Sequence, residues 1–360
     1  MPPLVIVLAI AVAAPFLWVM LVDDPLGGEP VAVVAIDDPK AKDPPLPPAM
    51  ASKTAAADKS NAQTVTIIDG KSGSRTQVAV QASEAAEEPV GTAPPLDARL
   101  SEASRHGSIP RVGSDGTRPL DVYSRADASA AARKSPQIAI VVGGLGIGAS
   151  ATGEAIARLP ASVTLAFAPY GADLNRWVTR ARGTGHEILL QVPMEPFDYP
   201  DNDPGPQTLL STLPATQNID RLHWFLSRFQ GYVGVTNFMG ARFTSNDTAF
   251  APVLSDIAAR GLLYFDDGAS TRSLAPKVAA AAKAPFLKAD LVVDAKANWS
   301  DIDAALEQLE RLAADRGYAV GMATALPVSI ERIARWAKAA ETRGVRIVPL
   351  SAVATRSKPS

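Results

Sequence analysis

The sequence has 360 residues, enough for one large domain or two small ones. It contains 35 Lys and Arg residues against 37 Asp and Glu residues, so no excess of positive charge favours a nucleic-acid partner. Cysteine is absent, which excludes disulfides, zinc-thiolate sites and thiol nucleophiles. Only three histidines are present, His106, His186 and His223, too few for a histidine-rich metal site.

The first segment, residues 1–22, is a membrane anchor or a signal segment. Residues 3–22 carry no charge, and roughly 20 apolar residues suffice for one membrane-spanning helix. A cleaved signal peptide is the alternative, with Ala11-Val12-Ala13 as the small-residue site, but the positive region that normally precedes such a site is missing. We therefore expect an anchor. The nearest cations, Lys40 and Lys42, are too far away to set its orientation.

The second segment, residues 23–135, is rich in Pro, Ala, Ser, Asp and Lys. Segments with so few large apolar side chains cannot bury enough surface to offset the entropy of ordering. We therefore expect a disordered linker that tethers the third segment, although a partner-binding stretch within it is an alternative. Residues 64–68 have the composition of a short local strand.

The third segment, residues 136–360, alternates short apolar runs with amphipathic stretches. Strands are expected at 138–142, 163–168, 187–192, 233–237, 262–265, 286–293, 319–324 and 346–350. Helices are expected at 150–159, 173–182, 217–229, 247–260, 275–283, 300–316 and 328–342. This alternation predicts an α/β fold with a parallel sheet, specifically a (β/α) barrel, irregular or with seven to eight strands. A doubly wound open sheet is the alternative, because periodicity does not show closure.

The site of such a barrel is expected at the carboxyl ends of its strands. The first of these turns is Gly143-Gly144-Leu145-Gly146. It does not have the spacing of a dinucleotide-binding loop, and the acid expected about 20 residues later is missing, so no cofactor is predicted.

From about residue 138 to 353, the sequence resembles the divergent polysaccharide deacetylase family, which has a NodB-like barrel. In that family the first apolar strand is followed by Asp-Asp and then Leu-Gly; here Gly143 and Gly144 replace the two aspartates. Three further motifs match except at one histidine each. Gln191 stands in the segment 185–196, Phe238 in Asn237-Phe-Met-Gly, and Thr324 at the end of the strand 319–324.

The resemblance implies that the replaced residues would have held a divalent metal. Such a metal polarises the substrate carbonyl and acidifies a water, and it needs three or more nitrogen or oxygen ligands with one open position. Because the substitutions fall on the expected ligands and spare their neighbours, we expect no metal site and no metal-dependent catalysis.

The polar residues that match the family remain as candidates. Asp266 and Glu195 are the candidate catalytic residues, since two close carboxylates can perform acid–base hydrolysis without metal. The alternative is that Asp266-Asp267-Gly268 only satisfies the amides of a turn. A ligand is expected to contact an aromatic ring and polar side chains, namely Tyr170, Gln191, Asn237, Arg242 and Arg272. Ordinary packing explains the aromatic residues equally well.

Two functions follow. The first is a catalytically impaired, deacetylase-like domain, anchored in the inner membrane by a single pass and exposed to the periplasm, that binds cell-envelope polysaccharide or an envelope protein. The cellular location comes from the resemblance. The second is an active carbohydrate hydrolase or deacetylase that uses the retained acids or a rearranged metal site. A purely structural envelope protein is a weaker third hypothesis.

Overall fold

A computed structural model describes residues 62–68, 75–81, 93–125 and 135–356. The expected anchor at residues 3–22 lies outside these ranges. None of the helices in the described ranges is long and apolar enough to cross a membrane. The anchor therefore stays a prediction.

The chain divides into two units, residues 1–82 and 83–360. In the first, β1 (Ala62–Ile68) pairs antiparallel with β2 (Arg75–Gln81), with Ala62 opposite Gln81. The local strand expected at residues 64–68 is part of β1.

The second unit is built on one sheet whose ladders are all parallel. The order in this sheet is β10-β9-β8-β7-β6-β5-β12-β11, with β13 beside β5. The strands are β5 (Gln137–Leu145), β6 (Thr164–Phe167), β7 (Ile188–Met194), β8 (Gly234–Met239), β9 (Leu263–Asp266), β10 (Phe286–Lys288), β11 (Leu291–Val292), β12 (Tyr318–Thr324) and β13 (Arg346–Ile347). Sequential order of parallel strands with helices between them confirms the predicted (β/α) barrel.

The barrel is irregular where its edges meet. The strand expected at residues 286–293 is divided between two neighbours: Lys288 pairs with Asp266 of β9, and Leu291 pairs with Gly321 of β12. The sheet therefore curls so that residues 286–293 supply both of its edge strands, β10 and β11. The strand expected at 346–350 is also shorter than predicted, because β13 contacts only the start of β5 and α10 (Leu350–Arg356) follows it.

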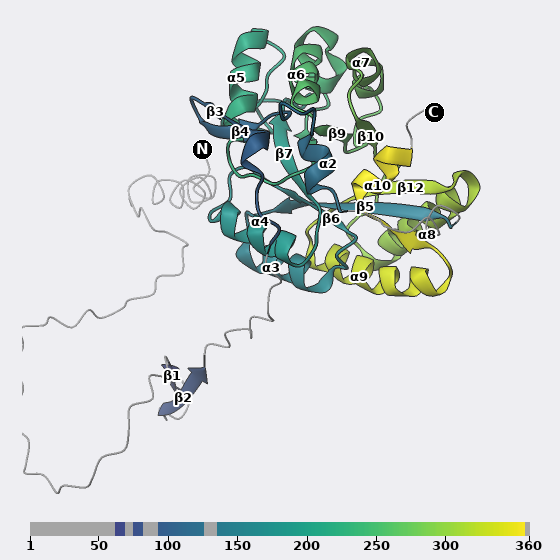
Figure 1. Ribbon diagram of the computed structural model, residues 1–360. Helices are drawn as coiled ribbons and strands as arrows, with labels where there is room; N and C mark the ends of the chain where they lie inside the picture. Colours follow the sequence, from purple (N-terminus) through teal and green to yellow (C-terminus); the bar gives the residue numbers. More distant parts are fainter. Residues whose placement is uncertain (1–61, 69–74, 82–92, 126–134, 357–360) are drawn as a thin grey trace, which may run out of the picture. The chain divides into compact units, whose positions relative to one another are not determined.

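Helices surround the strands (Figure 1). They are α3 (Ala149–Arg158), α4 (Leu174–Gly183), α5 (Ala215–Leu226), α6 (Asp247–Ala259), α7 (Ala275–Ala282), α8 (Trp299–Arg316) and α9 (Pro327–Thr342). The helical positions agree with the predicted ones to within a few residues. The N-cap of α8 is Asn298, whose side-chain oxygen accepts a hydrogen bond from the Asp301 amide.

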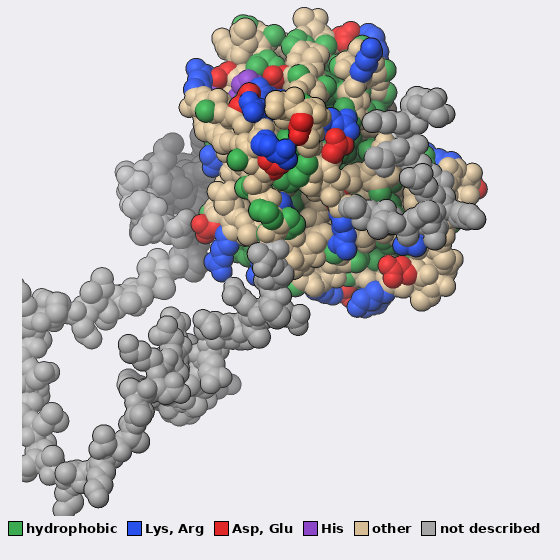
Figure 2. Space-filling model, in the orientation of Figure 1, with side chains coloured by type: hydrophobic (Ala, Val, Ile, Leu, Met, Phe, Trp, Pro, Cys, Tyr) green, Lys and Arg blue, Asp and Glu red, His purple; other side chains and the backbone are tan. Residues whose placement is uncertain are grey.

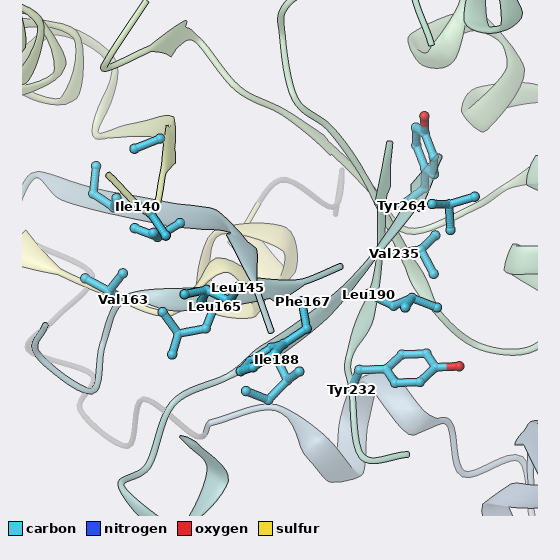
Figure 3. Close-up of a cluster of buried hydrophobic side chains, with 14 of the residues drawn as sticks. Ile140, Leu145, Val163, Leu165, Phe167, Ile188, Leu190, Tyr232, Val235 and Tyr264 are labelled. Carbon is cyan, nitrogen blue, oxygen red and sulfur yellow. The ribbon is translucent and has the colours of Figure 1, made fainter. Parts of the chain in front are cut away.

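Alternation along each strand separates two apolar layers. Outward residues pack against the helices; Figure 3 shows several of them, including Ile140, Leu165, Leu190, Val235 and Tyr264. Inward residues fill the barrel, namely Ala139, Val141, Ala166, Leu189, Leu263, Phe265, Leu287, Ala289, Val320 and Met322. Strands buried on both faces explain the continuous apolar runs in the sequence.

The amino end of the barrel is covered by α10 and by α2 (Pro119–Tyr123), both visible over the strands in Figure 1. Leu120, Leu350 and Val353 join the apolar cluster inside the barrel. Beside them the buried Glu187 carboxylate accepts hydrogen bonds from the Arg125 amide and from Ser351. Burial raises the pKa of Glu187. This carboxylate thus joins both covering segments to β7.

Residues 93–125 also belong to this unit, although we expected the linker to extend to residue 135. They form η1 (Ala98–Leu100), the hairpin of β3 (Ser101–Ser104) and β4 (Gly107–Pro110), and α2. Arg260 of the domain donates to Glu102 and to the Pro110 carbonyl, both at 2.8 Å. Figure 2 shows cationic and acidic side chains interspersed on the face that carries this segment.

The physical reason for this difference is that a few apolar residues are enough to order a short segment. Leu100, Ile109 and Leu120 are all buried, although their neighbours are polar. His106, which we had assigned to the linker, lies 2.9 Å from Asp220 of α5. His186 is buried at the start of β7 and its Nδ1 contacts the Val163 carbonyl at 2.8 Å, a structural role. Burial lowers the pKa of His186.

Candidate functional site

The first candidate position lies inside the barrel, at the end of β5. Gln191 of β7 is buried, and its Oε1 accepts a hydrogen bond from the Gly144 amide at 2.7 Å. A Cβ atom added at Gly143 would lie 2.7 Å from Cε of Met322 and 2.9 Å from Nε2 of Gln191. A side chain at position 143 would therefore require the flexible ends of Met322 and Gln191 to move aside.

The neighbouring glycine is constrained by its backbone. Gly144 has a φ of +81°, a conformation that costs a residue with a side chain about 1–2 kcal/mol. Its added Cβ would meet only the Thr324 methyl, at 3.6 Å, so crowding is not the obstacle there. The two glycines thus resist an aspartate for different reasons, one through packing and the other through backbone conformation.

The donor chemistry at this end of the barrel does not fit a divalent metal. Of the residues at the expected ligand positions, Gly143, Gly144 and Phe238 bring no side-chain donor, and Thr324 brings a hydroxyl. The amide oxygen of Gln191 already accepts a backbone hydrogen bond. Across the described ranges, no group of three or more His, Cys, Asp or Glu side chains gathers to hold an ion. A metal centre needs three or more such ligands.

Asn237, a predicted ligand contact, connects the ends of β8 and β9. Its Oδ1 accepts from the Asp267 amide at 3.1 Å, and its Nδ2 donates to the Met239 carbonyl at 2.8 Å. The side chain is buried. Asn237 therefore positions two turns, and its hydrogen-bonding groups are turned toward the chain itself.

Asp266, a predicted catalytic residue, is 1% exposed. Its Oδ1 accepts from the Gly268 amide at 2.9 Å, and its Oδ2 accepts from the Ser273 hydroxyl at 2.6 Å. Both oxygens are thus used within the turn that follows β9. This geometry is the turn arrangement that we gave as the alternative role for Asp266.

The acid with the most perturbed pKa at this end is its neighbour, Asp267. It is 9% exposed, and burial raises its pKa to about 6, with the nearby charge of Asp266 adding to the rise. Asp267 was expected among the acids at this end of the barrel but was not one of the predicted catalytic residues. The signal that could have identified it is alternation, because Leu263 and Phe265 face the barrel interior and the next odd position is Asp267.

Glu195, the second predicted catalytic residue, fastens the loops after β7 and β8. Its Oε2 accepts from the amide of Ser211 at 2.6 Å and from the hydroxyl of Ser211 at 2.5 Å. Its Oε1 lies 3.6 Å from the Arg242 guanidinium. Glu195 is 3% exposed, so its carboxylate faces these loops and not solvent.

The remaining predicted contacts lie nearer the surface. The Tyr170 hydroxyl donates to the Pro206 carbonyl, and its ring packs on Trp224 and Phe225. Burial raises the pKa of Tyr170. The Arg272 guanidinium lies over the Phe197 ring, 5.1 Å from its centroid. Arg242 and Arg272 are therefore the predicted residues that face solvent most openly.

Sequence reasoning overlooked the exposed apolar residues of this rim. Seven large apolar residues of the described ranges are exposed, and five of them lie at or after the carboxyl ends of the strands: Ile147, Phe197, Phe238, Trp299 and Leu326.

The sequence profile of the divergent polysaccharide deacetylases matches residues 140–354, more than half of the chain, from within β5 to within α10. The chain belongs to this family. It is 23% identical to the protein YibQ of Escherichia coli K12 over 195 residues, which is 54% of this chain and 60% of YibQ. It is also 22% identical to a Haemophilus influenzae protein over 179 residues, 49% of this chain and 62% of the relative.

A crystal structure from Agrobacterium tumefaciens C58 resembles this divergent polysaccharide deacetylase over 68% of the chain and 98% of the Agrobacterium protein. The sequence identity is 46% and the TM-score is 0.66. This match supports the same barrel. Since the chain spans about 60% of the length of the curated relatives, their activities are not transferred to it.

Proposed function

We propose that this protein is a membrane-anchored envelope protein whose deacetylase-like domain binds a glycan at the carboxyl end of the barrel without metal-dependent hydrolysis. The anchor would be residues 3–22 in the inner membrane, with the domain in the periplasm. The partner could also be an envelope protein that carries the glycan.

One observation carries the proposal that hydrolysis by metal is lost. Oε1 of Gln191 accepts a hydrogen bond from the Gly144 amide at 2.7 Å, at the position where the family has a metal-binding histidine. A neutral, hydrogen-bonded amide gives a metal no negative charge, and the two glycines at the aspartate positions give it no side-chain ligand.

The proposal is tested with the full-length chain, loaded separately with micromolar Zn²⁺, Mn²⁺ and Co²⁺ and then dialysed. Elemental analysis is expected to give well under one metal per chain, because the donor set lacks charged ligands. Glycan binding is measured in parallel on the same samples by calorimetry with soluble peptidoglycan fragments. One tightly held metal per chain, or no binding to any glycan, would contradict the proposal.

A second candidate function is metal-free hydrolysis, and Asp267 is the observation that favours it. A buried carboxyl with a pKa of about 6 is suited to exchange protons near neutral pH. Release of acetate from N-acetylated glycan fragments by the wild-type chain, with loss of that release in Asp267→Asn, would establish this alternative. Glycan binding without acetate release would favour the first function.

A further inference from the structure

The loops that follow β7, β8 and β9 form one continuous surface. The amides of Arg242 and Phe243 both donate to the Glu195 carbonyl at 3.1 Å, which fastens the β8 loop to the β7 loop. The Leu274 amide donates to the Thr244 carbonyl at 2.9 Å, which fastens the β9 loop to the β8 loop. Side chains on these loops are therefore held in fixed relative positions.

Two arginines and one aromatic ring stand on this surface. Phe197 is 49% exposed, with the Arg272 guanidinium over its ring, and the Arg242 side chain is 46% exposed. We call Phe197, Arg242 and Arg272 the cationic patch.

The positive charge of this patch is poorly neutralised. No carboxylate in the described ranges forms an ion pair with Arg272, whose interaction partner is the Phe197 ring. Within the described ranges the acidic partner of Arg242 is Glu195, whose Oε1 lies 3.6 Å from the guanidinium and whose Oε2 accepts two hydrogen bonds from Ser211. Two guanidinium groups are thus left with free donors on one side of the rim.

The loop after β7 also carries acidic residues. Asp203 accepts a hydrogen bond from the Gly205 amide, and Gly205 lies against the Tyr170 ring. Asp198 directly follows Phe197, and within the described ranges no ion pair joins it to Arg242 or Arg272. The exposed arginines after β8 and β9 therefore keep their charge available to a ligand.

We propose that the cationic patch binds an anionic glycan, with a carboxylate or phosphate held by Arg242 and Arg272 and a sugar ring stacked on Phe197. This inference rests on the proposed function and specifies its ligand class. A guanidinium group presents paired donors that match a carboxylate or phosphate, and the apolar face of a sugar ring packs well on an aromatic ring. The polar residues that would read a neutral sugar, such as Gln191 and Asn237, are occupied by the chain itself.

The test compares charged and neutral probes on the full-length chain by calorimetry at low salt. Oligogalacturonate is compared with its methyl ester, and phosphorylated dextran with dextran. At least one charged probe is expected to bind about tenfold more tightly than its neutral counterpart, since a charge-assisted contact contributes on the order of a tenfold effect. The probe that shows the larger ratio identifies carboxylate or phosphate as the recognised group.

Variants then assign the effect to the patch. Arg242→Ala and Arg272→Ala are each expected to weaken the charged probe about tenfold and to leave the neutral one unchanged. Arg272→Lys is expected to recover only part of the loss, because a lysine keeps the charge but not the planar donors. Arg311→Ala on α8 is the matched control, with an arginine that is 66% exposed, and is expected to bind like wild type.

The outcomes separate this inference from the proposed function. Equal binding of charged and neutral probes, or binding that is unaffected by both arginine substitutions, would overturn the inference while glycan binding stands. Absence of binding to every probe and to peptidoglycan fragments would overturn both.

Discussion

Buried carboxylates at the two ends of the barrel hold different parts of the chain. At the amino end, Glu187 accepts hydrogen bonds from Arg125 and Ser351, which are 62 and 164 residues away in the sequence. At the carboxyl end, Asp266 and Asp267 accept hydrogen bonds within the turn after β9, and Glu195 fastens the loops after β7 and β8. Glu187 therefore joins the segments that cover the barrel, whereas the acids of the carboxyl end order the loops around the candidate site.

The apolar residues follow the same division. Leu120, Leu350 and Val353 close the amino end from inside, while Phe197 and Trp299 at the carboxyl end are about half exposed. In (β/α) barrels, the amino end contributes stability and the carboxyl end carries the site. The comparison therefore predicts that substitutions at the amino end reduce stability, and that substitutions at the rim change binding with little loss of stability.

The largest effect is expected for Glu187→Ala. The substitution leaves the Arg125 amide and the Ser351 amide and hydroxyl without their acceptor in a buried position. A buried donor left without its acceptor costs about 1–3 kcal/mol, and this substitution leaves three donors without Glu187. Urea unfolding of the full-length chain should show this loss, and Glu187→Gln should lose less than half as much, because the glutamine keeps the shape and one acceptor. A loss below about 1 kcal/mol would show that Glu187 does not fasten this end.

The next effect is a pH dependence due to Asp267. Its pKa is raised from 3.8 to about 6, so the folded state holds the proton more tightly than the unfolded state. Its contribution to stability is therefore greatest below pH 3.8 and is lost as the pH rises through about 6. The difference between the two pKa values corresponds to roughly 3 kcal/mol of unfolding free energy.

Asp267→Asn removes this loss, since the asparagine stays neutral and keeps an acceptor for the Ala269 amide. Urea unfolding at pH 4 and at pH 7 should show this: the unfolding free energy of the variant minus that of wild type should rise by up to about 3 kcal/mol between the two pH values. The exposed Asp315→Asn is the control and should follow wild type at both values. If Asp267→Asn also follows wild type, the Asp267 carboxyl is not perturbed.

A smaller effect is expected inside the mouth of the barrel. Gly143→Asp should lower the unfolding free energy by about 1–3 kcal/mol, because its Cβ would lie 2.7 Å from Cε of Met322. Adding Met322→Ala should recover part of that loss by opening space, although Met322→Ala alone removes buried contacts. If the double variant loses as much unfolding free energy as the two single variants lose together, Met322 is not the obstacle.

Much of the fold could be predicted from the sequence because each strand is a continuous apolar run and each helix a 3.6-residue pattern. The segment 286–293 shows the limit of this approach. Its residues have the composition of one strand, but the division of its hydrogen bonds between β9 and β12 depends on how the sheet curls. Residues 93–125 show another limit, since Leu100, Ile109 and Leu120 are too sparse for composition to reveal their burial.

The site was predictable in its location and not in its internal contacts. Strand order alone places Gln191, Asn237 and Asp266 at one end of the barrel. Whether each side chain faces a ligand or its own backbone depends on hydrogen bonds such as that from the Gly144 amide to Gln191, which no sequence pattern specifies. Alternation along β9 could have placed Asp267 toward the barrel interior, but its raised pKa depends on a degree of burial that the folded structure defines.

The smallest effect on stability is expected at the rim. Phe197→Ala and Trp299→Ala remove rings that are 49% and 57% exposed, so little apolar surface returns to water on substitution. Each should change the unfolding free energy by less than about 1 kcal/mol. Leu350→Ala at the amino end removes a fully buried side chain and should cost about 2–5 kcal/mol.

Glycan binding measured on the same samples completes the comparison: Phe197→Ala should bind less at nearly unchanged stability, and Leu350→Ala should bind like wild type while it remains folded. A Phe197→Ala variant that loses several kcal/mol would mean that the ring serves packing, and the functional division between the two ends would then be wrong.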